Sequence, residues 1–319
     1  MHDIDENGGQ YRAVLKVVGV GGAGINAVNA MIDAGVQGVE FICLSFSARK
    51  LSTSKASTLI RISSDPKGLG TGGNPECARQ AMEEHQQQLA ENIQDADMIF
   101  ITAGMGSGTG TGASPLVAKF ARQAGALVVG VVTTPFMYEG KKRMTIAQAG
   151  ISELALHTDC LIVIPNEQLV AISEKGVSLR DAFKPADEIL RQAIQGIAEL
   201  INSHGVINAD FNDVKTVMME RGATMIGIGV ADGEKRASEA CTRAVNSPLL
   251  PETNLHGARG LLINITAGPD MTMDEFDVVT AFFHEKVSAD ANIIIGLVVD
   301  EAMTGRIKVT VIATGLHGR

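Results

Sequence analysis

The residues with the clearest chemistry are the alternating glycines from Gly104 to Gly112, which read Gly-Met-Gly-Ser-Gly-Thr-Gly-Thr-Gly. They follow the apolar run 98–102, which predicts a β-strand. Glycines let the backbone approach a ligand closely, and successive N–H groups can then converge on phosphate oxygens. A helix expected over 115–123 would add the positive end of its dipole, with Pro115 in its first turn. The run therefore predicts a phosphate-binding loop.

Two further glycine-rich loops strengthen this prediction. The segment 19–26 reads Gly-Val-Gly-Gly-Ala-Gly-Ile-Asn and follows the first expected strand, whereas 67–75 precedes a long polar helix. No Lys follows the run at 104–112 as it does in a Walker A motif. Three glycine loops after strands fit a nucleoside triphosphate that is held from several sides.

The segment 19–26 also matches the G-x-G-x-x-G pattern of dinucleotide-binding oxidoreductases. That fold needs an acidic residue at the end of the second strand to bind the ribose. Here the second strand is followed by Ser45, Phe46 and Ser47, and Glu40 precedes the body of the strand. A dinucleotide-dependent oxidoreductase stays open as an alternative that predicts retained NAD and no preference for guanine.

The elements that must position these loops alternate between strands and helices. Apolar runs predict five strands, at 13–20, 39–44, 98–102, 127–133 and 160–164. Helical patterns predict helices at 26–34, 75–92 and 115–123. This alternation is typical of a parallel sheet that is covered by helices on both faces.

A long amphipathic helix follows the expected sheet. Its apolar residues recur at spacings of one, three and four: Ile189, Leu190, Ala193, Ile194, Ile197, Leu200 and Ile201. A stripe this broad predicts a helix between two layers. Beyond it we expect four strands and two helices, at 225–230, 234–246, 260–265, 274–287, 293–299 and 307–312. The fold class is therefore α/β, with a Rossmann-like N-terminal domain, a central helix and a smaller C-terminal α/β domain.

Composition excludes several functional classes. The net charge of −9 argues against a nucleic-acid binder, which needs a basic face. The four cysteines form no C-x-x-C pair, so a zinc or redox motif is not expected. Residues 1–12 are polar and are expected to form a disordered arm rather than a signal peptide. No apolar stretch is long enough to span a bilayer.

The motifs together resemble the tubulin/FtsZ family. The segment 106–112 resembles its signature G-G-G-T-G-T-G with Ser107 for one glycine, and 208–213 resembles the loop that FtsZ proteins insert into a neighbouring subunit. Further matches follow in order at 73–75, 135–140, 164–166, 181–183 and 264–268. The resemblance implies a GTP-binding domain, a central helix and an activation domain, with bounds at 13–178, 179–204 and 205–319. It also implies a homopolymer, joined head to tail, that hydrolyses GTP at subunit interfaces.

The same resemblance implies GTP or GDP and Mg²⁺ as ligands and assigns roles to individual residues. The implied phosphate-binding residues are Gly21, Gly22, Gly72, Gly73, Gly104, Gly106, Ser107, Gly108, Thr109, Gly110, Thr111 and Gly112. The implied ribose and base residues are Glu139, Arg143, Asn26, Asn166, Glu188 and Phe183. Glu139 and Arg143 would contact ribose and phosphate, and Phe183 would stack on the guanine. Glu188 would read the guanine where the family has Asp. Without the resemblance, core packing for Phe183 and solvation for Arg143 would be preferred.

The implied catalytic residues are Asn208, Asp210 and Asp213. Two carboxylates three residues apart can polarise a water that is aligned with the γ-phosphate held by the next subunit. Either Asp can instead cap the helix expected from Val214, and the two roles are compatible.

Two departures from the family pattern bear on function. Ser45-Phe46-Ser47 stands where FtsZ proteins have Asn-Thr-Asp, which removes a carboxylate from the region of the metal. This leaves open a structural filament protein that binds nucleotide but has weak or no GTPase activity. The chain also stops shortly after its last expected strand, without the disordered linker and adaptor-binding tail of typical members. We therefore expect a cytoplasmic protein without direct membrane binding, either naturally tailless or truncated.

Overall fold

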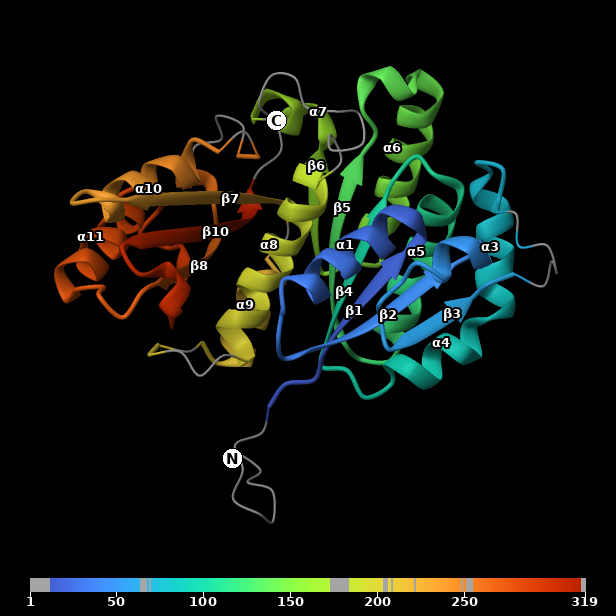
Figure 1. The fold of residues 1–319 in the computed structure, drawn as a ribbon, viewed down its shortest axis with the longest axis horizontal. Coiled ribbons are helices and arrows are strands. Elements are labelled where there is room, and N and C mark those ends of the chain that lie inside the picture. The colour runs from blue at the N-terminus through green and yellow to red at the C-terminus, as the bar shows by residue number, and fades with distance from the viewer. Residues whose placement is uncertain are drawn as a thin grey trace, which may run out of the picture.

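The computed structural model describes residues 12–63, 68, 70–172, 184–202, 206–207, 209–220, 222–247, 249–250 and 255–316. Six strands form its parallel N-terminal sheet: β1 Leu15–Val20, β2 Val39–Ser45, β3 Thr58–Arg61, β4 Met98–Gly104, β5 Leu127–Thr134 and β6 Cys160–Pro165. They lie in the order β3-β2-β1-β4-β5-β6 (Figure 1). The direction of strand order reverses between β1 and β4. Ligands of open α/β sheets bind in the crevice outside the carboxyl ends of strands at such a point.

Helices cover both faces of this sheet (Figure 1). They are α1 Gly21–Asp33, α2 Ala48–Leu51, α3 Pro75–Glu84, α4 Gln86–Ile93, α5 Gly108–Gln123, α6 Lys141–Ala155 and α7 Asn166–Ile172. Neighbouring strand residues enter different cores: Val17 and Phe100 belong to one buried cluster, and Val18 and Ile101 to another. Because successive side chains point to opposite faces, both faces of the sheet are buried.

The central helix α8, Lys184–Asn202, lies between the two parts of the molecule. Leu190 and Ile194 share one hydrophobic cluster with Met31 of α1 and with Leu262 and Ile312 of the C-terminal strands. The prediction of a helix between two layers is confirmed. The helix begins beside one end of the N-terminal sheet, and the next helix, α9 Phe211–Met218, lies beyond its other end (Figure 1).

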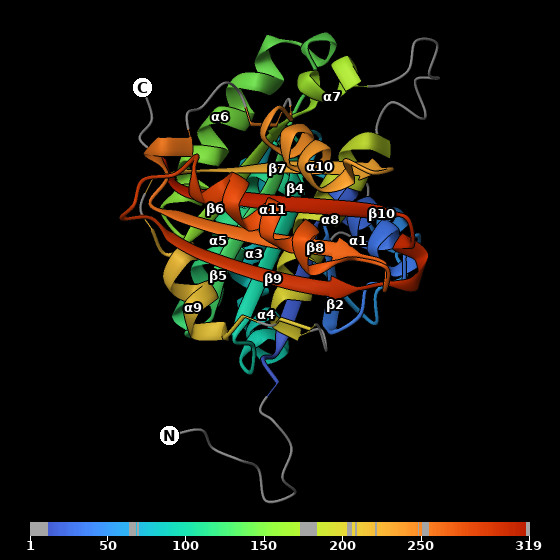
Figure 2. The ribbon, with the colours of Figure 1, turned by 90° about the vertical axis from the view of Figure 1, so that its left-hand side faces the viewer.

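The C-terminal strands continue the sheet in the order β7-β10-β8-β9 (Figure 2). Their bounds, with those of the two long helices, are β7 Ala223–Asp232, α10 Arg236–Val245, β8 Gly260–Ala267, α11 Met273–His284, β9 Asn292–Val299 and β10 Arg306–Leu316. β10 runs antiparallel to both β7 and β8, and β9 is parallel to β8. α10 and α11 bury one face of these strands, whereas α8 and α9 bury the other. The predicted α/β fold class with its two sheet-bearing parts is confirmed.

The structure also differs from the sequence-based expectations. β3 and α6 were not expected, and the polar helix expected at 75–92 is divided at His85 into α3 and α4. The placement of Pro115 in a first helical turn is wrong, because α5 already begins at Gly108. Ser107 caps this helix early, since its Oγ accepts a hydrogen bond of 3.1 Å from the Gly110 N–H. The predicted domain bounds stay a prediction.

Two glycines of β7 allow α10 to pack closely on the sheet. A Cβ at Gly229 would lie 2.1 Å from the Ala240 carbonyl oxygen, and one at Gly227 would lie 2.1 Å from that of Ala244. Because both neighbours are helix backbone, neither can move aside as a flexible side chain would. Contact at this distance therefore requires glycine.

We expect Gly229→Ala to lower the free energy of unfolding by about 1–3 kcal/mol, as overpacked sites do. A Cβ at Gly257 meets nothing within 4 Å, so Gly257→Ala is the matched control, with an expected change within about 0.5 kcal/mol. Urea unfolding of the two variants measures the difference. Equal unfolding midpoints would contradict the packing argument.

Candidate functional site

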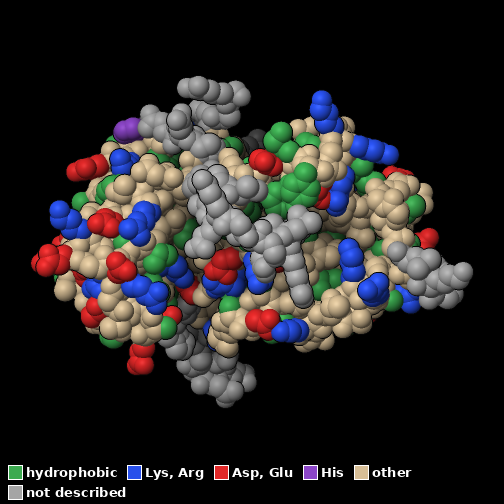
Figure 3. All heavy atoms as spheres, turned by 45° about the horizontal axis from the view of Figure 1, so that its top comes forward, with side chains coloured by type: hydrophobic (Ala, Val, Ile, Leu, Met, Phe, Trp, Pro, Cys, Tyr) green, Lys and Arg blue, Asp and Glu red, His purple; other side chains and the backbone are tan. Residues whose placement is uncertain are grey.

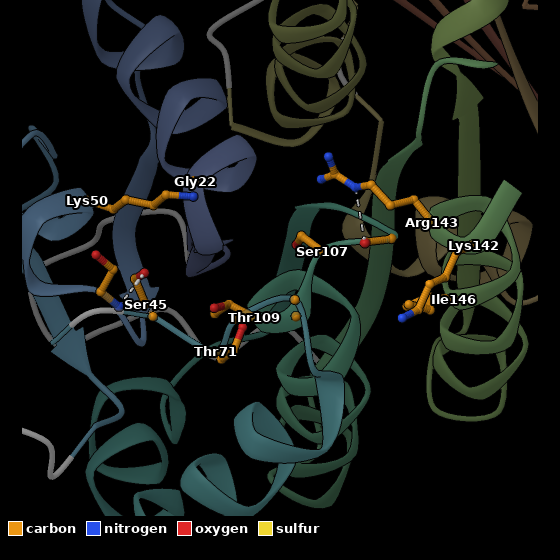
Figure 4. Close-up of a pocket in the computed structure, with 15 residues that line it drawn as sticks. Gly22, Ser45, Lys50, Thr71, Ser107, Thr109, Lys142, Arg143 and Ile146 are labelled. Carbon is orange, nitrogen blue, oxygen red and sulfur yellow. Dashed lines mark hydrogen bonds between the residues drawn. The ribbon is translucent and has the colours of Figure 1, made fainter. Parts of the chain in front are cut away.

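A cavity of about 530 Å³ opens at the carboxyl ends of the N-terminal strands (Figure 4). A smaller cavity of about 140 Å³ adjoins it, and the two share Gly22, Lys50, Ser107 and Arg143. The combined space lies at the reversal of strand order, beside the segments that follow β1 and β4. Its size is in the range of small-molecule sites.

Two helix N-termini face this space. β1 continues directly into α1, and none of the side chains there caps the first turn of the helix, which leaves its N–H groups available. Gly21 makes this junction at φ +71°, and Gly106 turns the chain toward α5 at φ +86°. Both values lie in the left-handed region, which favours glycine. The N-termini of α1 and α5 thus offer N–H donors and dipoles to an anion.

The three glycine-rich segments of the sequence converge here. A Cβ at Gly108 would lie 2.0 Å from the Thr71 Oγ1, and one at Gly21 would lie 3.3 Å from the Gly110 N. A Cβ at Gly112 would lie 2.0 Å from the Pro75 carbonyl oxygen. Glycine at these positions lets α5 approach the segment that leads into α3. The expectation that the three loops hold one ligand from several sides therefore has a structural basis.

Two hydroxyl groups of the signature segment organise its backbone. The Gly106 N–H donates a 2.8 Å hydrogen bond to the Thr111 Oγ1, and the Ser107 Oγ donates one of 2.9 Å to the Gly104 carbonyl. Thr111 is buried and lines neither cavity, whereas Thr109 lines the larger one. Among these hydroxyls, Thr109 is therefore the one that best fits a direct phosphate contact.

Glu139 and Arg143 form an ion pair of 2.5 Å at the edge of the smaller cavity, which both residues line. The Glu139 carboxylate also accepts a hydrogen bond of 3.0 Å from the Phe136 N–H. The Arg143 Nε donates to the Gly106 carbonyl at 3.4 Å, which the dashed line in Figure 4 marks. These contacts hold an acceptor and a cation beside the start of α5.

The far end of the smaller cavity carries amide and carboxyl groups. Asn26, Asn166 and Asp187 line it. Asn166 is 5 % exposed, and within the described part of the chain its Oδ1 has no hydrogen-bond partner. Burial raises the pKa of Asp187 to about 7. An unsatisfied amide beside a poorly solvated carboxyl group is suited to a polar ligand that supplies complementary donors and acceptors.

Glu188, expected to contact the base, lines neither cavity. Its carboxylate accepts a 2.7 Å hydrogen bond from the Arg191 Nε. Burial raises its pKa, but the hydrogen bonds and charge of Arg191 lower it more, so the net shift is downward. Successive helix residues differ by about 100° in direction, so only one of Asp187 and Glu188 can face the cavity. No signal in the sequence distinguishes two adjacent carboxylates near the start of a helix.

Asp210 and Asp213 lie outside both cavities. Asp210 caps α9 by accepting a hydrogen bond of 2.7 Å from the Asn212 N–H, and Asp213 is exposed in the first turn. α9 follows the end of α8 remote from Asp187 (Figure 1). With 19 residues, α8 is about 28 Å long, so these carboxylates lie far from the cavity of their own chain. The other two expected residues, Asn208 and Phe183, lie outside the described residues.

The charge of the larger cavity is positive. Lys50, Lys142 and Arg143 line it, and its described lining contains no Asp or Glu. Lys50 was not predicted, because nothing in a sequence shows that the helix after β2 turns toward the glycine loops. On the face in Figure 3, basic and acidic side chains are interspersed outside the grey atoms. The positive charge is therefore a local property of the cavity.

The raised pKa of Asp187 makes a prediction about stability. An unfolded Asp titrates near 3.9, so between about pH 4 and pH 7 the unfolded chain has lost a proton that the folded protein still holds. The free energy of unfolding should fall as the pH rises through this interval, and Asp187→Asn should lack this part of the fall.

Urea unfolding of both nucleotide-free proteins at about pH 5 and about pH 7.5 measures the effect. The wild-type protein should lose stability relative to Asp187→Asn at the higher pH. A difference between the two proteins that is the same at both pH values would contradict the buried-carboxyl assignment.

No described helix is long and apolar enough to cross a membrane.

Residues 14–174 match the family model of the Tubulin/FtsZ family, GTPase domain, and residues 222–317 match that of the FtsZ family, C-terminal domain. The cell division protein FtsZ of Buchnera aphidicola subsp. Baizongia pistaciae (strain Bp) is 48 % identical over 305 residues, which cover 95 % of this chain and 79 % of that protein.

Solved structures agree with these matches. The empty FtsZ dimer of M. jannaschii is 43 % identical and has a TM-score of 0.91, over 96 % of this chain and 89 % of that one. CetZ2 from Haloferax volcanii, in a protofilament with bound GTPγS, is 20 % identical with a TM-score of 0.77. The match covers 94 % of this chain and 92 % of that one. At 20 % identity it supports a shared fold and nothing more.

Proposed function

Because the chain belongs to the FtsZ family of tubulin-related GTPases, we propose that it hydrolyses GTP where two of its subunits meet head to tail in a filament. Guanine-nucleotide binding and GTPase activity follow from the family. Membership also removes the dinucleotide-dependent oxidoreductase as an alternative. The name of the Buchnera relative, cell division protein FtsZ, favours a role in cell division, and we propose that this role lies in the cytoplasm.

The observation that carries the in-trans mechanism is the separation of the two halves of the site. The glycine segments lie at one end of α8, and Asp210 and Asp213 follow its other end, about 28 Å away. A contact that joins these different surfaces of identical subunits is heterologous, and when its rotation does not close it makes a filament. Each contact then brings the carboxylates of one subunit to the phosphates of the next. The FtsZ dimer of M. jannaschii supports self-association in this family.

The base-binding role passes from Glu188 to Asp187 in this proposal. An ionised Asp187 accepts hydrogen bonds from the N1–H and N2–H₂ groups of guanine, and the Asn166 Oδ1, which has no partner among the described residues, supplies a further polar contact. Asn26 lines the same cavity. The role of Phe183 as a stacking partner stays a prediction.

The phosphates would lie in the larger cavity. The starts of α1 and α5 border this space, where Gly22, Gly106 and Gly108 line it. Gly72 and Gly73 line it from the opposite segment, at φ +59° and +79°. Arg143, held by Glu139, lies where the two cavities join and can reach both ribose and phosphate.

We expect Asp213→Ala to retain GTP binding and to lose about 100-fold or more of its turnover, because a water-polarising carboxylate is missing. Phosphate release and sedimentation, measured over a range of protein concentrations, test this together with the filament. Wild-type turnover per subunit should rise above a threshold concentration. Asp274→Ala, an exposed Asp in the first turn of α11, is the matched control.

A mixing experiment distinguishes catalysis in trans from catalysis within one chain. Asp213→Ala subunits have an intact cavity, and subunits defective in nucleotide binding have intact α9 carboxylates. Mixed filaments therefore contain some complete sites, and part of the activity should return. Total turnover that is strictly proportional to protein concentration, or no recovery of activity on mixing, would defeat the in-trans mechanism.

The structural-filament alternative predicts only trace turnover of the wild type inside stable filaments. One observation supports this alternative: the described lining of the larger cavity contains no carboxylate.

Base recognition gives a separate prediction. Asp187→Asn replaces an acceptor with a group that also donates, so GDP affinity should fall about 10- to 100-fold while xanthosine diphosphate, with a carbonyl at C2, loses less. Because only the ionised carboxylate accepts both guanine bonds, wild-type GDP affinity should also decline below about pH 7.

Titration calorimetry with both nucleotides at several pH values provides the measurement. Glu188→Gln is the control, since that side chain lies outside both cavities. If Glu188→Gln changes the guanine preference and Asp187→Asn does not, the assignment of Asp187 is wrong.

A further inference from the structure

Lys50 contributes a cation that the sequence motifs did not predict. It belongs to α2, which is separated from β2 by two residues, and it lines both cavities. In Figure 4 its side chain extends from α2 toward Gly22. Its Nζ lies 2.6 Å from the position that a Cβ at Gly22 would take. The ammonium group therefore lies against the first turn of α1, beside the space for the phosphates.

Among the residues that the structure describes, the Lys50 ammonium group has no competing partner. Within the described part of the chain, no hydrogen bond or ion pair engages the Lys50 Nζ, although its backbone carbonyl accepts a 2.7 Å bond from the Thr53 hydroxyl. Arg143, in contrast, is already paired with Glu139. Lys50 thus has all its N–H donors available for an anionic ligand.

The described residues do not fit a magnesium ion held by protein carboxylates. Mg²⁺ prefers octahedral oxygen ligands, usually with one or two carboxylates. The position where the family has Asp is Ser47, and the described lining of the larger cavity has hydroxyls and cations but no carboxylate. No group of three or more His, Cys, Asp or Glu side chains that could hold a metal occurs among the described residues.

On the premise that this cavity holds a guanine nucleotide, we propose that the Lys50 ammonium group binds its phosphates in place of a protein-held magnesium ion. The loss of a carboxylate at position 47 and the presence of a cation at position 50 are then two parts of one change. The cavity neutralises phosphate charge with its own side chain. A Cβ at position 22 would lie 2.6 Å from the Lys50 Nζ, so glycine there leaves room for the ammonium group in this position.

The test measures binding of the non-hydrolysable analogue GMPPCP to the full chain by calorimetry, with Mg²⁺ and with EDTA. Wild-type affinity should differ less than about threefold between the two conditions. Lys50→Ala should lose about 10- to 100-fold in EDTA, the effect of removing a hydrogen bond to a charged group. Lys55→Ala removes an equal charge from an exposed pair with Asp33 and should bind as the wild type does.

The double variant Ser47→Asp/Lys50→Ala provides the converse test, since it restores a carboxylate and removes the cation. Its binding should depend on Mg²⁺ more steeply than that of either the wild type or Lys50→Ala. Wild-type affinity that collapses in EDTA, or Lys50→Ala affinity equal to the wild type in EDTA, would overturn the proposal. If the wild type binds no guanine nucleotide in either condition, the proposed function itself fails, and the two failures are thus distinguishable.

Discussion

The site depends on the close approach of backbone segments that have no Cβ atoms between them. The start of α5 lies against the segment that leads into α3 so closely that a Cβ at Gly108 or Gly112 would lie 2.0 Å from an oxygen atom, and Gly21 lies close to Gly110. This approach brings two helix N-termini to one point where the strand order reverses. A polyphosphate needs many N–H donors in a small volume, and this packing concentrates them. Arg143 and Lys50 lie at the edge of this group of N–H donors, and the positions of their side chains depend on it.

Much of the fold could be predicted from the sequence because it depends on local patterns. Buried parallel strands are continuous apolar runs, and the stripe of α8 is wide enough to indicate burial on two sides. What could not be predicted depends on tertiary contacts. Glycines 108, 110 and 112 are poor helix formers, yet they begin α5, since the gain from close packing outweighs their low helix propensity. β3 is only four residues long and gives too short a pattern to distinguish from a loop.

The site was predicted in its chemical character more than in its individual side chains. The glycine segments converge as expected, because motif and strand position together specify a place in the fold. Glu188 was expected to read the base, but it lines neither cavity, whereas its neighbour Asp187 lines the smaller one. A motif match does not decide which of two neighbours on a helix faces inward. Lys50 was not among the expected site residues, because the comparison with the family motif in this segment drew attention only to the carboxylate missing at Ser47.

In the proposed in-trans mechanism, the placement of α9 beyond the far end of α8 makes the contact between two subunits, rather than one subunit, the unit of catalysis. In an open filament, a chain of n subunits contains n − 1 completed sites, so one terminal subunit keeps its nucleotide without facing carboxylates. The two ends of the polymer therefore differ chemically even though every subunit is identical. On this proposal, the separation of the nucleotide cavity from α9 along α8 gives the filament a direction, and the nucleotide that a subunit holds, GTP or GDP, reports how long the subunit has been in the filament.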